Sequence, residues 1–204
     1  MPGHGPPLAE PRRILARRAH ALAQGEGAEL WEELLAQAYA SVASGRRAAL
    51  GARRGVLPAM AAELGEVSPV EAAYRPTAPA LAGSAEIAEG VQVVRAALAR
   101  TRDRQARAGA WLIGPHRDEV QFLLGGEDAR RLGSRGVERT LALALRTAEA
   151  EILERQAGAT PLALRDDVLP ELDEERRRRV VARALARARA VRPYRVEAGQ
   201  VLPA

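Results

Sequence analysis

The length, composition and charge of the chain exclude several classes of protein. Its 204 residues contain no cysteine, 3% aromatic and 47% hydrophobic residues, mainly Ala, Leu and Val, and they carry a formal net charge of +5. These values predict a helix-rich cytoplasmic protein with a core of small side chains, and they exclude a disulfide framework, a thiolate zinc site and a bilayer-spanning run of roughly 20 apolar residues.

The N-terminal part of the chain is predicted to be a lead-in followed by a helical domain. Residues 1–11 contain four prolines and two glycines, so we expect them to be disordered or loosely attached. In residues 12–64, apolar side chains recur at three- and four-residue spacing, which is typical of a helix with one apolar face. This apolar stripe consists of Leu30, Trp31, Leu34, Leu35, Ala38, Tyr39 and Val42. Prolines and glycines then indicate a loop with one short strand near Ala72–Arg75, and a second helix is predicted from Ser84, its cap, to Gly109.

Residues 109–204 are predicted to form a separate α/β domain, because short β-type runs alternate with helices. We therefore place a domain boundary near residue 109. A Gly-Pro turn joins the first two expected strands, Ala110–Ile113 and Val120–Leu124. The remaining expected elements are a helix at Val137–Arg155, an apolar strand ending at Arg165, an Arg-rich helix at Asp173–Ala190 and a last strand in YRVEAGQV.

The basic residues are all arginine. There are 31 of them and no lysine, and a guanidinium can donate two parallel hydrogen bonds to a phosphate. Helix arginines are therefore candidates for contacts with a nucleic acid; they are Arg12, Arg13, Arg17, Arg18, Arg46 and Arg47. The alternatives are a solvated helix face and a coding bias toward arginine. Because the sequence contains no lysine, it cannot form the G-x-x-x-x-G-K-[ST] loop that binds nucleotide phosphates.

Two adjacent carboxylates end an apolar run in LALRDD. The first, Asp166, can hold Mg²⁺ at the end of a strand, and the second, Asp167, can orient an attacking water. Aspartates such as Asp167 and Asp173 also commonly cap turns and helices. The pattern alone leaves both interpretations open.

Two further motifs carry polar side chains. A Ser-x-Gly-x-x-Arg turn at residues 134–139 leads into a helix, whose N-terminus offers free N–H groups and a positive dipole end to a phosphate. A Gly-Pro-His-Arg-Asp run occupies residues 114–118. Protein kinases also contain His-Arg-Asp, but they need an asparagine beyond it and an earlier lysine, which this sequence lacks. A metal site at His116 and Asp118 has little support, because the other histidines stand in unrelated context.

These motifs resemble the RecF family of bacterial DNA replication and repair proteins, which are ATP-binding-cassette ATPases related to chromosome-maintenance proteins. The resemblance is to the C-terminal half of the family, and it is strongest over residues 109–180, where the Gly-Pro-His-Arg-Asp run is its most specific part. AELWEELLAQAYASVASGRR resembles the family's helical lid. The resemblance implies a helix-rich α/β fold, with a lid-like domain at residues 12–108 and a partial ATPase head at residues 109–204.

The resemblance also implies roles for single residues. LALRDD corresponds to the Walker B strand, so Asp166 would be linked to Mg²⁺ and Asp167 would polarise water. The signature and D-loop residues that would contact a nucleotide held by another subunit are Ser134, Gly136 and Asp173. The residues that match the family run near the nucleotide are His116, Arg117 and Asp118, and they receive no further role. The implied cofactors are ATP and Mg²⁺.

The partners implied by the resemblance are single-stranded or gapped DNA, recombination mediator proteins, and a second copy of the chain or a complementing head segment. The resemblance also implies a nucleoid-associated protein that acts in the DNA-damage (SOS) response. The nucleotide site departs from the family pattern, because no Walker A segment is found and the signature is altered at Arg135, Val137 and Glu138. Arg165 and Pro170 also replace the usual residue types. We therefore expect a truncated RecF-like protein that does not hydrolyse ATP alone. The alternatives are a non-catalytic interaction module that uses the apolar stripe, or a non-functional fragment.

Overall fold

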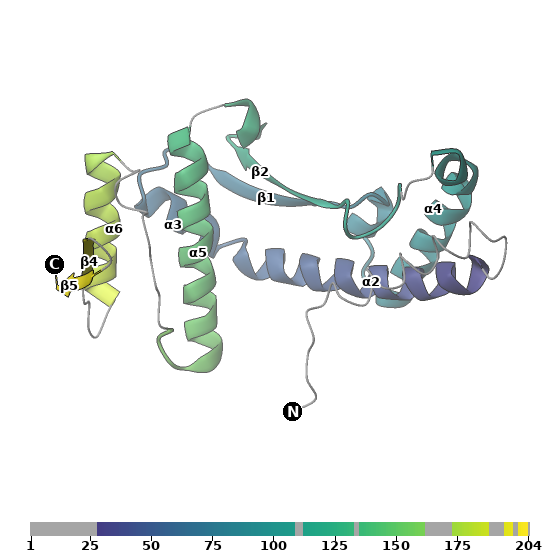
Figure 1. The fold of residues 1–204 in the computed structure, drawn as a ribbon, viewed down its shortest axis with the longest axis horizontal. Helices are drawn as coiled ribbons and strands as arrows, with labels where there is room; N and C mark the ends of the chain where they lie inside the picture. Colours follow the sequence, from purple (N-terminus) through teal and green to yellow (C-terminus); the bar gives the residue numbers. More distant parts are fainter. Residues whose placement is uncertain are drawn as a thin grey trace. The chain divides into compact units, whose positions relative to one another are not determined.

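The computed structural model describes residues 28–108, 112–132, 135–161, 173–187, 194–197 and 200–203 (Figure 1). These residues form two compact units that alternate along the chain. Unit 1 lies within Met1–Ala52 and Ala72–Phe122, and unit 2 lies within Arg53–Glu71 and Leu123–Ala204. In the described part of the chain, no helix is long and apolar enough to span a membrane.

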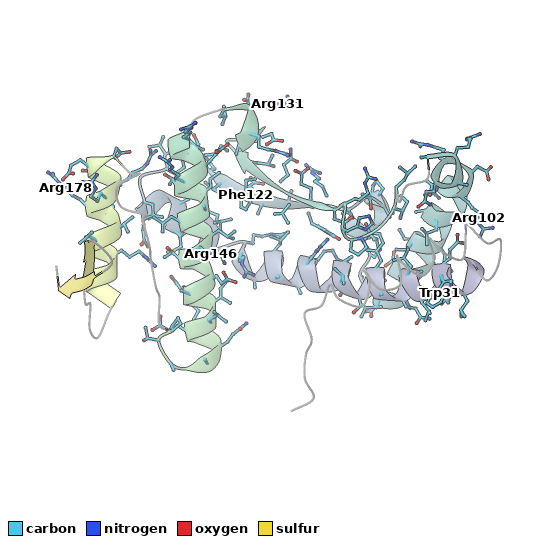
Figure 2. The ribbon with its side chains drawn as sticks, in the orientation of Figure 1. Trp31, Arg102, Phe122, Arg131, Arg146 and Arg178 are labelled. Atoms are coloured by element: carbon cyan, nitrogen blue, oxygen red, sulfur yellow. The ribbon has the colours of Figure 1, made fainter. Side chains whose placement is uncertain are left out.

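Unit 1 is built around helix α2 (Ala28–Arg53) and helix α4 (Ile87–Ala108), with the 3₁₀ turn η1 (Pro79–Ala82) beside α4. Its core consists of Leu35, Ala36, Tyr39, Ala43, Tyr74, Ala78, Leu81, Val94, Ala97, Leu98 and Ile113. The two helices approach closely, because a Cβ on Gly90 would lie 3.1 Å from the Ala40 Cβ. Trp31 packs at the edge of this core, and Arg102 pairs with Glu32 at 2.6 Å; Figure 2 shows the first on α2 and the second on α4.

The predicted apolar stripe is only partly correct. Leu35 and Tyr39 are fully buried, as a stripe facing the core requires, but Leu30 is 62% exposed and Leu34 is 36% exposed. The buried face of α2 is centred on residues 35, 36, 39 and 43, so residues 30 and 34 lie toward its solvent side. Sequence periodicity therefore predicted the helix correctly, but the predicted apolar face is wider than the face that is buried.

Helix boundaries in unit 1 and at its border largely follow the sequence prediction. The described part of the predicted helical region forms two helices, α2 and α3 (Val56–Glu63). Helix α3 carries Pro58 in its first turn, where the missing backbone N–H of proline costs little. The predicted second helix is confirmed as α4. Ser84 does not cap it, because its hydroxyl donates to the Ala80 carbonyl at 3.2 Å instead.

A small sheet follows the order β1-β2-β3, formed by β1 (Val70–Arg75), β2 (Glu119–Leu124) and β3 (Glu127–Asp128). The predicted strands near residues 72–75 and 120–124 are thereby confirmed. The predicted strand Ala110–Ile113 is wrong for its last two residues, since Leu112 and Ile113 are not in a strand. Ile113 is instead buried in the core of unit 1, so its apolar character reflects packing, and the other residues of that run lie outside the described part.

Strands β2 and β3 form an antiparallel hairpin in which Leu124 pairs with Glu127. Gly125 and Gly126 connect them with φ values of 57° and 88°. Both angles are positive, as a two-residue type I′ turn requires, and glycine adopts them without steric cost.

Unit 2 contains α3, α5 (Arg135–Ala157) and α6 (Glu174–Arg187), and α3 packs against α5. In Figure 1, α5 and α6 are drawn with roughly parallel axes. Arg183 of α6 connects the three helices, because it bonds to Glu151 of α5 at 3.0 Å and to Glu63 of α3. The predicted helix at Val137–Arg155 is confirmed with slightly different ends. The predicted helix at Asp173–Ala190 is confirmed over Glu174–Arg187, and residues 188–190 lie outside the described part.

The C-terminal strand prediction needs correction, because YRVEAGQV holds parts of two strands. These are β4 (Tyr194–Glu197) and β5 (Gln200–Pro203), which pair antiparallel. The predicted lead-in at residues 1–11 and the predicted strand ending at Arg165 lie outside the described residues.

The division into two units does not coincide with the boundary expected near residue 109. Unit 2 takes Arg53–Glu71 from the expected first domain, and unit 1 takes residues 109–122 from the expected second one. The physical reason is long-range packing: α3 packs on α5, whereas the chain after α4 is bonded to α2. The assignment of a lid to residues 12–108 and an ATPase head to residues 109–204 stays a prediction.

Candidate functional site

The Gly-Pro-His-Arg-Asp run forms a turn between α4 and β2 in unit 1. The Arg117 N–H donates to the Gly114 carbonyl at 3.1 Å and closes the turn. Gly114 and Pro115 are buried, whereas His116 and Arg117 are exposed. The motif therefore presents two neighbouring polar side chains on a fixed backbone.

The carboxylate of Asp118 anchors this turn. It is fully buried and accepts hydrogen bonds from the Thr77 N–H at 2.8 Å and from the Thr77 hydroxyl at 3.1 Å. The hydroxyls of Tyr39 and Tyr74 also donate to it. Its charged partner is Arg46, whose Nη1 lies 3.0 Å from Oδ2. We call Asp118 and these four partners the Asp118 network.

Arg46 and Thr77 extend the network to the turn's own backbone. Arg46 Nη1 donates to the Pro115 carbonyl at 2.7 Å, and its guanidinium lies 6.0 Å from the centre of the Tyr74 ring. The Thr77 hydroxyl accepts from the Gly114 N–H at 3.0 Å. Helix α2, strand β1 and the segment after it are thereby bonded to one buried acid. Such a network is stabilising because nearly every buried polar group in it has a partner.

The environment of the network changes the acidity of both tyrosines. Burial and the neighbouring carboxylate of Asp118 raise the pKa of Tyr39 and of Tyr74 well above the ordinary value for tyrosine. Both phenols therefore stay protonated at neutral pH and remain hydrogen-bond donors.

The environment of the turn also changes its histidine. Partial burial and the adjacent Arg117 lower the pKa of His116, and Asp118 only partly offsets them. His116 is therefore mostly neutral at pH 7.

The structure argues against a metal at His116 and Asp118. The carboxylate oxygens of Asp118 already accept hydrogen bonds from protein donors, which leaves little capacity for a cation. Among the described residues, no group of three His, Cys, Asp or Glu side chains could hold a metal ion.

The other predicted site residues belong to unit 2 or lie outside the described part. Gly136 stands in the first turn of α5, where its carbonyl accepts from the Thr140 hydroxyl at 2.8 Å. Asp173 caps α6, because its carboxylate accepts from the Arg176 N–H at 2.9 Å, and this bond lowers the pKa of Asp173. Ser134, Asp166 and Asp167 lie outside the described residues.

The capping interpretation is confirmed for Asp173. The signature, Walker B and D-loop roles stay predictions.

Sequence reasoning missed most of the Asp118 network. Tyr39 was attributed to the apolar stripe, and Arg46 was a candidate for contact with phosphate, whereas both bond to an acid more than 70 residues away in the chain. Arg47 likewise donates to the Leu81 carbonyl, at 2.6 Å. One signal was present, since a tyrosine on an apolar helix face needs a partner for its hydroxyl when it is buried.

In comparisons with known proteins, the chain is similar to proteins named RecF. No family model matches it. A curated protein named DNA replication and repair protein RecF, from Geotalea daltonii, is 35% identical over 173 residues, which are 83% of this chain and 47% of that protein. The protein of the same name from Geobacter sulfurreducens is 37% identical over 170 residues, which are 82% of this chain and 46% of that protein. The chain thus spans about half the length of the curated relatives it matches.

Solved structures agree with the sequence matches. A structure described as the recombination mediator protein RecF-ATP in the RecFOR pathway superposes on 97% of this chain and 57% of its own, with a TM-score of 0.78 at 23% identity. A second, described as RecF-ATPrS, gives a TM-score of 0.78 at 24% identity. This likeness concerns the fold, and it confirms the predicted helix-rich α/β class.

Proposed function

We propose that this chain, which is RecF-like in its sequence and its fold, acts in DNA replication and recombinational repair as part of an ATP-binding protein. The observation that carries the proposal is the match over 83% of the chain to a protein named for DNA replication and repair. The structural likeness over 97% of the chain supports it through the fold. The turn at residues 114–118 supports it at the level of single residues, because the most specific part of the resemblance is held in place by the Asp118 network.

Within this function, the partners would be DNA, recombination mediator proteins and a second RecF-like head. The matched structures are described with ATP and with the RecFOR pathway, so we extend both to this chain as a proposal. Gly136 at the start of α5 would face a nucleotide from the positive end of the helix dipole. Ser134, Asp166, Asp167 and Asp173 keep the roles that the resemblance implies for a site that binds ATP and Mg²⁺.

ATP hydrolysis by these 204 residues alone is not part of the proposal. The chain contains no lysine, so it cannot supply the lysine of a Walker A loop. We therefore assign this chain to binding and assembly, with the phosphate-binding loop coming from residues outside this sequence.

The test is DNA binding by the purified chain across a salt series, with and without Mg-ATP. We expect binding to single-stranded or gapped DNA that weakens steeply with salt, because phosphate contacts release counterions. We expect Mg-ATP to leave the affinity unchanged. Absence of binding at low salt would refute the proposal for this chain, and an increase with ATP would refute the assignment of the phosphate-binding loop elsewhere.

One observation favours a second candidate function, a protein-interaction module. Leu30 and Leu34 stand four residues apart on α2 and are 62% and 36% exposed, so they form a small apolar face on one side of the helix. If a partner binds there, Leu34→Asp abolishes the association, whereas Ser134→Ala and Asp166→Ala leave it intact. The opposite pattern would remove this candidate.

A further inference from the structure

We propose that one exposed side of helix α4 is a docking surface for the sugar-phosphate backbone of DNA. Three arginines form this surface, Arg100, Arg104 and Arg107, and we call them the α4 arginine row. The assignment rests on the proposed function and makes it more specific, because it places the DNA contact on one face of one helix.

The arginines of α4 lie on two different sides of the helix. Arg95 and Arg102 are seven residues apart, which is about two turns, so they share one side. That side faces α2, because Arg95 pairs there with Glu33. Arg102, labelled in Figure 2, pairs with Glu32 of α2 at 2.6 Å. The charges of these two arginines are therefore balanced by acids within unit 1.

The α4 arginine row occupies the opposite side. At about 3.6 residues per turn, its three positions fall within about 60° of one another and lie roughly 160° around the helix from Arg95 and Arg102. All three side chains of the row are exposed. Within the described part of the chain, none of them takes part in a hydrogen bond or an ion pair. A phosphate can therefore bind them without displacing any of the described acids.

Two arginines that the sequence suggested for DNA contact are instead engaged within unit 1. Arg46 donates to Asp118 at 3.0 Å, and Arg47 donates to the Leu81 carbonyl at 2.6 Å. Each would have to break a hydrogen bond inside the protein before it contacts DNA, and breaking such a bond leaves a buried acceptor unsatisfied. The α4 arginine row has no such cost, so the structure moves the candidate surface from α2 to α4.

The spacing of the row fits an extended chain of negative charges. Residues 100 to 107 cover about 10 Å of the helix axis at about 1.5 Å per residue. One DNA strand carries a phosphate about every 3.4 Å along its axis, so this length matches about three phosphates. Each guanidinium can donate two parallel hydrogen bonds to a phosphate. Three groups spread over two helical turns therefore suit a strand backbone better than one small anion.

One acid borders the row. Asp103 is exposed and lies about 60° to one side of Arg100. With three arginines and one aspartate, this side of α4 keeps a positive net charge between residues 100 and 107. Such a surface attracts a polyanion, and the charge of Asp103 opposes that attraction. Removing this charge therefore gives a test of opposite sign.

The experiment measures DNA binding by the intact chain across a salt series, with fluorescence anisotropy of a labelled single-stranded oligonucleotide. The row variant carries Arg100→Gln, Arg104→Gln and Arg107→Gln. The matched control removes the same charge from three exposed arginines that are paired with acids, Arg130, Arg146 and Arg178, also by substitution to glutamine. Thermal unfolding of both triple variants should match wild type, because exposed side chains contribute little to stability.

We expect the salt dependence of binding to weaken in the row variant. Each phosphate contact of a single strand contributes about 0.7 to the slope of log affinity against log salt, so the slope should fall by about 2. Affinity at the lowest salt should fall at least about tenfold. The control triple should keep the slope of wild type, and Asp103→Asn should bind DNA more tightly than wild type.

The outcomes separate the surface from the proposed function. A loss confined to the row variant, with unchanged thermal unfolding, supports the surface. A row variant that binds with the slope and affinity of wild type overturns the surface and leaves the proposed function standing. Equal losses in the two triple variants also overturn the surface, because binding then depends on net charge alone. If wild type does not bind DNA at low salt, the surface and the proposed function both fail.

Discussion

Replacing Asp118 by alanine tests whether the buried network holds unit 1 together. The substitution removes a fully buried carboxylate and leaves its donors behind. Arg46 is 27% exposed and can turn toward water, and Tyr39 keeps the Thr77 hydroxyl at 2.9 Å. The Tyr74 hydroxyl and the Thr77 N–H lose their acceptor, and each unsatisfied buried group costs about 1–3 kcal/mol.

The expected loss for Asp118→Ala is therefore about 2–6 kcal/mol, because two buried groups lose their acceptor at about 1–3 kcal/mol each. Typical domains have only about 5–15 kcal/mol of stability, so the variant should unfold at much lower denaturant. Urea unfolding monitored by tryptophan fluorescence reports the change, because Trp31 packs against the core of unit 1. The control is Asp103→Ala, an exposed acid on α4 that should change stability by less than about 0.5 kcal/mol. Equal midpoints for the two variants would refute the reasoning.

Three further predictions concern pH and unit 2. The pKa of Tyr39 and of Tyr74 is higher in the folded state than in the unfolded state, so their contribution to stability is complete below the unfolded pKa of about 10 and is lost as the pH rises beyond it. Thermal melts from pH 8 to 11 should show this loss. In the variant with both tyrosines replaced by phenylalanine, the melting temperature should depend less on pH over this range. Arg183→Met should cost about 1–3 kcal/mol in urea unfolding, because Glu151 and Glu63 would both lose their ion pair with α6, and a variant as stable as wild type would contradict the bridging role. Asp173→Ala should fray the first turn of α6 and lower its amide-exchange protection at neutral pH. Because the pKa of Asp173 is lowered, that difference should be lost only as the pH falls through this lowered pKa, below the ordinary range for an aspartate; a difference that persists once the carboxylate is protonated would exclude charge-assisted capping.

Local features of the sequence predicted local structure well. The three- and four-residue spacing in α2 and the period in α5 gave helices at the right places, because helix formation depends on neighbours within one or two turns. The Gly-Pro run and the β-type residues 120–124 gave the turn and strand β2. Local features failed where burial decided the outcome: Ile113 is apolar because it packs in the core, and Ser84 bonds backward to η1 instead of capping α4.

The sequence by itself determined the positions of the described helices and of strands β1 and β2, the arginine-only chemistry and the resemblance to the RecF family, because each depends on residue type and spacing along the chain. Only the tertiary structure decided what Asp118 does. Its partners come from α2, from β1 and from Thr77, and no local pattern relates Tyr39 or Arg46 to an acid more than 70 residues later. The same holds for the two units, which alternate along the chain because α3 packs on α5. Contacts of this kind form only when the chain folds, since a buried charge must find donors wherever the fold brings them.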